Sequence, residues 1–86
     1  ALDELTDESV LVVRAVPSVA VRGDRLQLSL PDRRIELPAI LQVPLRRLLD
    51  GTPCPLAELA GHLDLDSRLV LVRRLVREGV LGLARD

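Results

Sequence analysis

Residues 35–51 have the sequence IELPAILQVPLRRLLDG, and within them the spacing of apolar side chains changes from two residues to about 3.6. Ile35 and Leu37 flank a polar residue, which is the alternation of a short strand, and Pro38 ends it. The apolar residues that follow share one helical face, and Gly51 suits the C-terminal cap of that helix: Ile40, Leu41, Leu45, Leu48 and Leu49. A strand over 35–37 therefore leads into a helix near residues 40–50.

The residues before this segment have the pattern of antiparallel strands. Residues 10–16 form a nearly continuous apolar run rich in β-branched side chains, which predicts a strand buried on both faces. Residues 19–30 alternate apolar and polar side chains around Gly23-Asp24, the pattern of a β-hairpin with one wet face and one core face. Residues 31–34 predict a second turn, so we expect a small antiparallel sheet within residues 10–37.

The residues after Gly51 return to helical spacing. They predict a short second helix near 55–61 and a longer third helix near 66–78, with its N-terminal cap assigned to Asp66. Residues 80–84 predict a final strand. The expected fold is α+β, a single domain over residues 1–86 with an acidic lead-in (1–9), strands (10–37), three helices (39–79) and one strand after them (80–84).

The composition excludes several functions. The 86 residues contain no Phe, Trp, Tyr or Met, which excludes aromatic cages and base stacking on aromatic rings. Twelve basic residues against thirteen acidic ones give a net charge of -1, so no global positive field attracts nucleic acid or anionic lipid. The high apolar content, 48%, indicates that some apolar surface is covered by a partner.

The sequence also favours one compartment. Cys54 is the single cysteine, which excludes an internal disulfide and fits a reducing environment. No apolar stretch approaches the ~18 residues of a membrane span, and the acidic first ten residues are unlike a signal peptide. We expect a cytoplasmic chain with no membrane partner. Its start at Ala1 fits either removal of the initial methionine or a fragment of a longer protein.

Three segments carry a resemblance to a known family: RLQLSLPDR at 25–33 with LPA at 37–39, LRRLLDG at 45–51, and RLVLVRRL at 68–75. With the order of helices around them, they resemble the C-terminal winged helix-turn-helix domain of bacterial JmjC/cupin-family proteins, relatives of the ribosomal oxygenases, over about residues 5–82. The resemblance implies a parent protein hydroxylase that uses Fe(II) and 2-oxoglutarate in an N-terminal domain outside this sequence. Iron sites of that class need two histidines and a carboxylate, and this chain has only His62, so we expect no cofactor in this chain.

No constellation of residues predicts catalysis or metal binding. His62 suits the end of the second helix, and Cys54 between two prolines suits an inert thiol. Asp50, Asp64 and Asp66 lack the spacing of a calcium loop. We therefore expect no catalytic, cofactor or metal residue and no small-molecule substrate.

The third helix carries the candidate contact residues. Arg73, Arg74 and Arg77 lie where a winged helix reads DNA, but its N-terminal end has Asp66, whose charge repels phosphate, and lacks the usual base-reading side chains. Residues 69–72 are four apolar residues in a row, wider than one core stripe. We expect Val70 and Leu71 to lie nearer a docking contact than Leu69 and Val72, with the arginines as its polar rim.

Three functional hypotheses remain open. The first is a non-catalytic winged-helix accessory or interaction domain of the oxygenase-type parent, in contact with the parent's catalytic or dimerisation domain or with a second copy. The second is a DNA-binding regulator domain, which the near-zero net charge disfavours. The third is a peptide-docking module that resembles PqqD-like recognition elements, which also place strands before three helices and add a peptide to a sheet edge.

Overall fold

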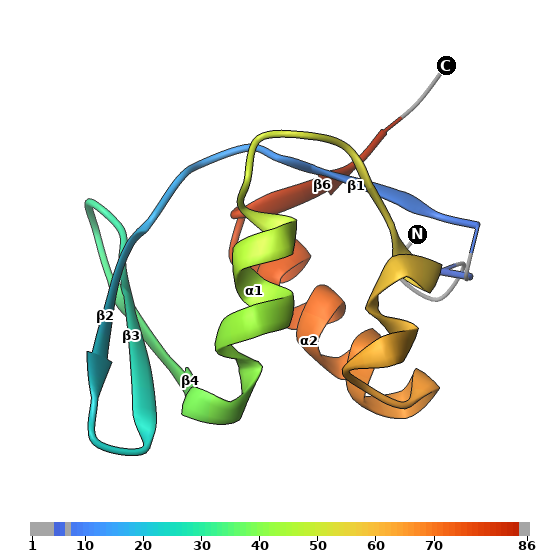
Figure 1. Cartoon of the computed structure of the whole chain (residues 1–86). Coiled ribbons are helices and arrows are strands. Elements are labelled where there is room, and N and C mark those ends of the chain that lie inside the picture. The colour runs from blue at the N-terminus through green and yellow to red at the C-terminus, as the bar shows by residue number, and fades with distance from the viewer. Residues whose placement is uncertain (1–4, 7, 85–86) are drawn as a thin grey trace.

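The computed structural model of the chain describes residues 5, 6 and 8–84 and has an α+β fold with two small antiparallel sheets. One sheet has the strand order β5-β1-β6, from Cys54–Pro55, Val10–Val13 and Leu81–Leu83. The other has the order β2-β3-β4, from Ser18–Arg22, Arg25–Ser29 and Arg34–Pro38. Figure 1 shows this second sheet on one side of helix α1 (Gln42–Leu48), while β1 and β6 lie side by side across the other end of the molecule.

The β2-β3-β4 sheet confirms the predicted hairpin and the short strand that follows it. Gly23 has a φ of +60°, which the first position of a two-residue hairpin turn of type II′ requires and which side chains disfavour. Alternate residues of β3 and β4 point into the core: Leu26, Leu28, Ile35 and Leu37 are buried. All five residues of β2 are exposed, so the predicted core face is confined to β3 and β4.

The predicted strand over residues 10–16 is wrong in its second half. β1 ends at Val13, because the backbone N–H groups of Arg14 and Ala15 both donate to the carbonyl of Val80 and the chain bends there. Only Leu11 is fully buried within β1, and Val16 is largely exposed. The β-branched run correctly indicated a strand. The strand is shorter and less buried than its apolar side chains predicted.

The order of strands and helices differs from the prediction at β5. This two-residue strand lies between α1 and the next helix and pairs with β1, with Cys54 opposite Leu11. Two residues are too few to show alternation, and flanking prolines suggested only an extended link. Because β5 and β6 pair with β1, the strands form two sheets instead of one.

The first two helices differ from the prediction in type and are slightly shorter, whereas the third has the predicted length and begins and ends one residue earlier. The first begins as a 3-10 turn, η2 (Ala39–Leu41), and continues as α1 with Pro44 in its first turn, where its missing N–H breaks no helical bond. The second is a 3-10 helix, η3 (Leu56–Gly61). The third, α2 (Leu65–Arg77), is the one long α-helix of the described residues. The predicted acidic lead-in falls in part on residues 1–4 and 7, which lie outside the described residues.

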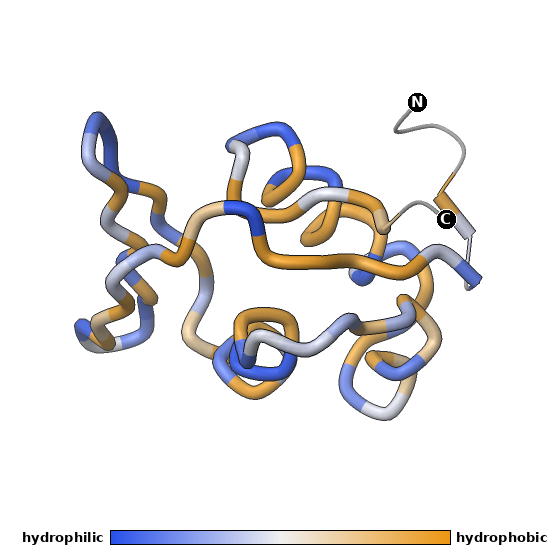
Figure 2. Tube along the Cα trace, turned by 90° about the horizontal axis from the view of Figure 1, so that it is seen from above, coloured by the Kyte–Doolittle hydropathy of each residue, from blue (hydrophilic) through white to orange (hydrophobic). Residues whose placement is uncertain are grey.

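One core joins both sheets and all helices. Its buried side chains are almost all leucine, isoleucine and valine, and they come from both ends of the chain, from Leu11 in β1 to Leu81 in β6. Figure 2 shows hydrophilic residues on the outer turns of the helices and at the hairpin tips, with apolar segments toward the middle. α2 contributes Leu71, Val72 and Leu75 to this core, together with the buried Arg68.

The N-terminal cap of α2 is Asp64, and its assignment to Asp66 is wrong. The Asp64 side chain accepts a 2.8 Å hydrogen bond from the backbone N–H of Ser67, and the backbone of Asp64 is extended. Asp66 already lies inside the helix. Both carboxylates precede the apolar periodicity, so the sequence alone did not separate them.

Asp64→Ala should lower the melting temperature by about 5 °C, because it leaves an N–H of the first turn without its acceptor. Asp66→Ala should lower it less, since the Asp66 side chain makes no hydrogen bond with the described residues. Thermal unfolding followed by circular dichroism measures both. An equal drop for the two variants would contradict the assignment of the cap.

Candidate functional site

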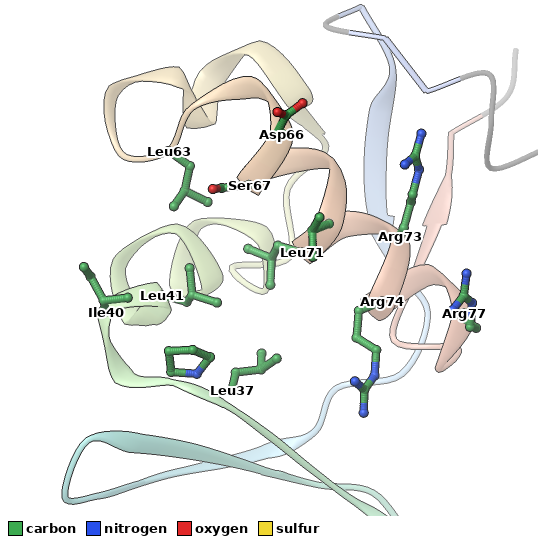
Figure 3. A pocket seen from close by; sticks show the side chains of 12 residues that line it. Leu37, Ile40, Leu41, Leu63, Asp66, Ser67, Leu71, Arg73, Arg74 and Arg77 are labelled. Carbon is green, nitrogen blue, oxygen red and sulfur yellow. The ribbon is translucent and has the colours of Figure 1, made fainter.

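A groove of about 800 Å³ lies between the end of β4 and the outer face of α2 and is open to solvent. Figure 3 shows its apolar side chains on one side and its arginines on the other. One wall comes from β4 and η2, with Leu37, Pro38, Ile40 and Leu41. The opposite wall comes from α2 and from Leu63 just before it, and its α2 residues are Asp66, Ser67, Val70, Leu71, Arg73, Arg74 and Arg77. A volume of this size is typical of ligand-binding clefts.

The floor of the groove is apolar and its mouth carries exposed aliphatic side chains. Leu37 and Leu71 are buried and form part of the floor. Ile40 is 83% exposed and Val70 is 67% exposed, on opposite walls. Exposed aliphatic groups that line a cleft mark a contact surface more clearly than single ones scattered over a surface.

The structure places the predicted docking residues of α2 at different depths. Val70 lies at the surface, whereas Leu71 is only 3% exposed and belongs to the core. Leu71 therefore contributes to the floor of the groove and Val70 to its mouth. Val72 is fully buried and Leu69 is half-buried against the core. The four apolar residues 69–72 therefore wrap around the helix, and only Val70 faces outward.

Glu78 links the C-terminal end of α2 to the β2-β3-β4 sheet. Its carboxylate accepts a hydrogen bond from Arg74 Nε at 3.0 Å and one from Arg33 Nε at 2.8 Å. Arg33 also donates to the backbone carbonyl of Glu78. Because Arg33 immediately precedes β4, Glu78 ties the end of α2 to the start of that strand.

Two arginines of the same wall are unpaired. Within the part of the chain that the structure describes, neither Arg73 nor Arg77 has an ion pair or a side-chain hydrogen bond. The Nε of Arg73 is buried without a hydrogen-bond partner, although the residue as a whole is half-exposed. A buried donor without an acceptor is uncommon in folded proteins, and an incoming carboxylate would suit the guanidinium that carries it.

The outer edge of β4 presents backbone groups beside this groove. Leu30 and Arg33 exchange two backbone hydrogen bonds, and Ala39 donates to Asp24, which fixes the side from which β4 bonds to β3. The backbone groups of alternate residues in a strand point to opposite sides. The N–H and C=O groups of Ile35 and Leu37 therefore bond to β3. The N–H and C=O groups of Arg34 and Glu36 therefore point away from the sheet.

The candidate residues outside the groove have structural surroundings. His62 is exposed and follows η3 as its C-terminal cap. Cys54 is fully buried, and this burial raises the pKa of its thiol, which disfavours a reactive thiolate. Hydrogen bonds from Thr52 to Asp50 and from Ser67 to Asp64 lower the pKa values of these two carboxyls.

Sequence reasoning missed the wall that β4 and η2 contribute. Ile40 and Leu41 were assigned to the buried face of a helix, but a 3-10 turn rotates Ile40 into solvent. Pro44 was the available signal, because proline is best accommodated in the first turn of an α-helix, so the residues before Gln42 belong to a separate turn.

Comparisons with protein-family models, with curated proteins and with solved structures find no match to this chain. Among residues 5, 6 and 8–84, no three His, Cys, Asp or Glu side chains lie together in a way that could hold a metal ion. No helix in this same part of the chain is long and apolar enough to cross a bilayer. The geometry of the groove is therefore the basis for the function proposed below.

The link through Glu78 should make the stability depend on pH. Hydrogen bonds from Arg74 and then from Arg33 lower the pKa of Glu78 in the folded chain. The unfolded chain then binds more protons than the folded chain as the pH falls, so this contribution is present above about pH 5 and is lost below it. We expect the melting temperature to fall from pH 5 to about pH 3, and to fall less steeply in Glu78→Gln.

Glu8→Gln is the matched control, because the Glu8 carboxylate accepts no hydrogen bond within the described residues. Differential scanning calorimetry across this pH range measures the three proteins. Identical slopes for the wild type and Glu78→Gln would contradict the link.

Proposed function

We propose that this chain is a non-catalytic interaction domain that docks an extended, acidic peptide in the groove between β4 and α2. The observation that carries the proposal is the coincidence of three features in one place. A strand edge with outward backbone groups, an apolar floor and two unpaired arginines all lie around the same open groove.

Strand addition is the binding mode that the outer edge of β4 favours. The outward N–H and C=O groups of Arg34 and Glu36 can pair with the backbone of a peptide regardless of its side chains. In an added strand, alternate side chains point to the same face as Ile35 and Leu37. Those side chains would enter the groove and contact Ile40 and Val70, which selects small or medium aliphatic residues.

The charge of α2 sets the preferred charge of the peptide. Arg74 is neutralised by Glu78, so Arg73 and Arg77 supply the uncompensated positive charge toward the C-terminal end of α2, while Asp66 leaves a negative charge at its N-terminal end. Carboxylates form charge-assisted, bidentate hydrogen bonds with guanidinium groups. A peptide that alternates aliphatic and acidic residues meets both requirements.

The same wall disfavours the DNA-binding alternative. Asp66 and Ser67 lie at the N-terminal end of α2, where a recognition helix contacts base edges. A carboxylate there repels the phosphate backbone, and the chain as a whole carries a net charge of -1. The arginines lie instead toward the far end of α2, where Arg74 points toward the β2-β3-β4 sheet and Arg73 points toward β1 and β6 (Figure 3).

We also propose that the chain is a winged-helix domain of an oxygenase-type parent protein. This part of the proposal rests on the sequence resemblance alone. An accessory domain of such a parent could present the groove to a segment of its partner or substrate protein. The PqqD-like alternative has the same binding mode, and the position of β2, β3 and β4 before the helical segments supports it, although β5 lies between α1 and η3. Both alternatives give this chain a docking role without chemistry of its own.

The test uses a seven-residue peptide that alternates valine and glutamate, with blocked ends, and the matching peptide of valine and lysine. Isothermal titration calorimetry should detect the glutamate peptide and not the lysine peptide. Arg77→Glu should weaken binding at least about tenfold, because it replaces an attraction with a repulsion. Arg46→Glu, the same charge change on α1 outside the groove, should leave the affinity within about twofold.

Glu36→Pro tests the strand edge in the same assay. It removes the outward N–H of Glu36, so it should abolish measurable binding. The backbone hydrogen bonds to β3 stay intact, and only the long, exposed side-chain bond from Gln27 to Glu36 is lost. Equal binding of both peptides, or binding unaffected by Glu36→Pro, would refute the proposal.

A further inference from the structure

The opposite edge of the β2-β3-β4 sheet is apolar and unprotected. β2 is exposed along its whole length, with Val19 45% and Val21 52% exposed. Among the described residues, no strand pairs with its outer side. Natural edge strands are usually protected by lysine, proline or a bulge. β2 has Arg22 at one end and Pro17 just before the other, and the three residues between its ends have no such protection.

The hairpin fixes which backbone groups of β2 point outward. Arg22 and Arg25 flank the two-residue turn, so they form the first hydrogen-bonded pair of the hairpin. Alternation then turns Ser18 and Ala20 toward β3 as well. The N–H and C=O groups of Val19 and Val21 point away from the sheet.

This edge is complementary to itself in one antiparallel register. When Ala20 lies opposite Ala20 of a second copy, Val19 of each chain lies opposite Val21 of the other. Both outward residues of each strand are then used, and the pair makes four backbone hydrogen bonds. A shift of the register by two residues places either Val19 opposite Val19 or Val21 opposite Val21 of the second copy. Only two of the four backbone hydrogen bonds then form.

The side chains agree with the same register. Each Arg22 lies opposite Ser18 of the other copy, so no like charges meet across the pair. The small Ala20 side chains meet at the twofold axis, where the non-hydrogen-bonded geometry brings opposite residues closest. Val19 and Val21 line a second groove of about 450 Å³ against Leu45 of α1 and Leu49 directly after it, and paired valines would cover part of this groove.

We propose that two copies of this chain associate through β2 into a twofold dimer with a continuous six-stranded sheet. The dimer leaves each β4 at an outer edge of that sheet, so both peptide grooves stay open and face opposite ends. This proposal does not rest on the peptide-docking function, because it uses the other edge of the sheet. The two grooves would nevertheless give the dimer two linked docking sites.

Sedimentation equilibrium over a range of concentrations tests the dimer. Val21→Pro removes an outward N–H from each copy without breaking a bond to β3, so it should weaken association at least about tenfold. Glu36→Pro is the matched control, since it places proline at an outward position of the other edge and should leave the dimer intact. Circular dichroism shows whether both variants keep the fold.

A charge exchange at the axis distinguishes lost pairing from damaged folding. Ala20 is exposed, so Ala20→Asp and Ala20→Arg should each fold and each dimerise less well than the wild type, because like charges then meet at the axis. An equimolar mixture of the two variants should recover the dimer as a heterodimer. A wild type that stays monomeric up to about 1 mM, or variants that show no recovery on mixing, would overturn the proposal.

Discussion

The burial of one face of α2 is the constraint on which the rest of the structure depends. Leu71, Val72 and Leu75 anchor this helix in a core that contains no aromatic side chain. With that face fixed, Val70, Arg73 and Arg77 must lie on the faces that remain, toward β4 and solvent. The hydrogen bond that Glu78 accepts from Arg33 then holds the end of the helix beside the start of β4, and an open groove lies between the helix and the strand.

The fold could be predicted from the sequence where a periodic pattern was long enough to be distinctive. The Gly23-Asp24 hairpin, the strand around Ile35 and Leu37, and α2 all follow from alternation or helical spacing over several residues. The prediction was wrong where a tertiary contact decides the structure. β5 exists because Cys54 and Pro55 pair with β1, and β1 ends early because Val80 accepts two backbone bonds.

The candidate site could be predicted only on its α2 side. The arginines and the wide apolar stripe of residues 69–72 indicated a contact surface on the third helix, and Val70 does lie at the groove. The opposite wall depends on how β4 and η2 fold back across α2, and no local pattern records that arrangement. The unpaired edges of β4 and β2 likewise follow from strand order, which is a property of the sheet and not of either segment.

The availability of the β4 edge is the central claim of this account, and amide hydrogen exchange in the peptide-free chain tests it most directly. Within β4, the amides of Ile35 and Leu37 bond to β3, whereas the amide of Glu36 points outward. Residue-resolved exchange by NMR should therefore show Ile35 and Leu37 protected and Glu36 exchanging at least about tenfold faster. Equal protection of all three amides would mean that this edge is already covered, and would contradict the account.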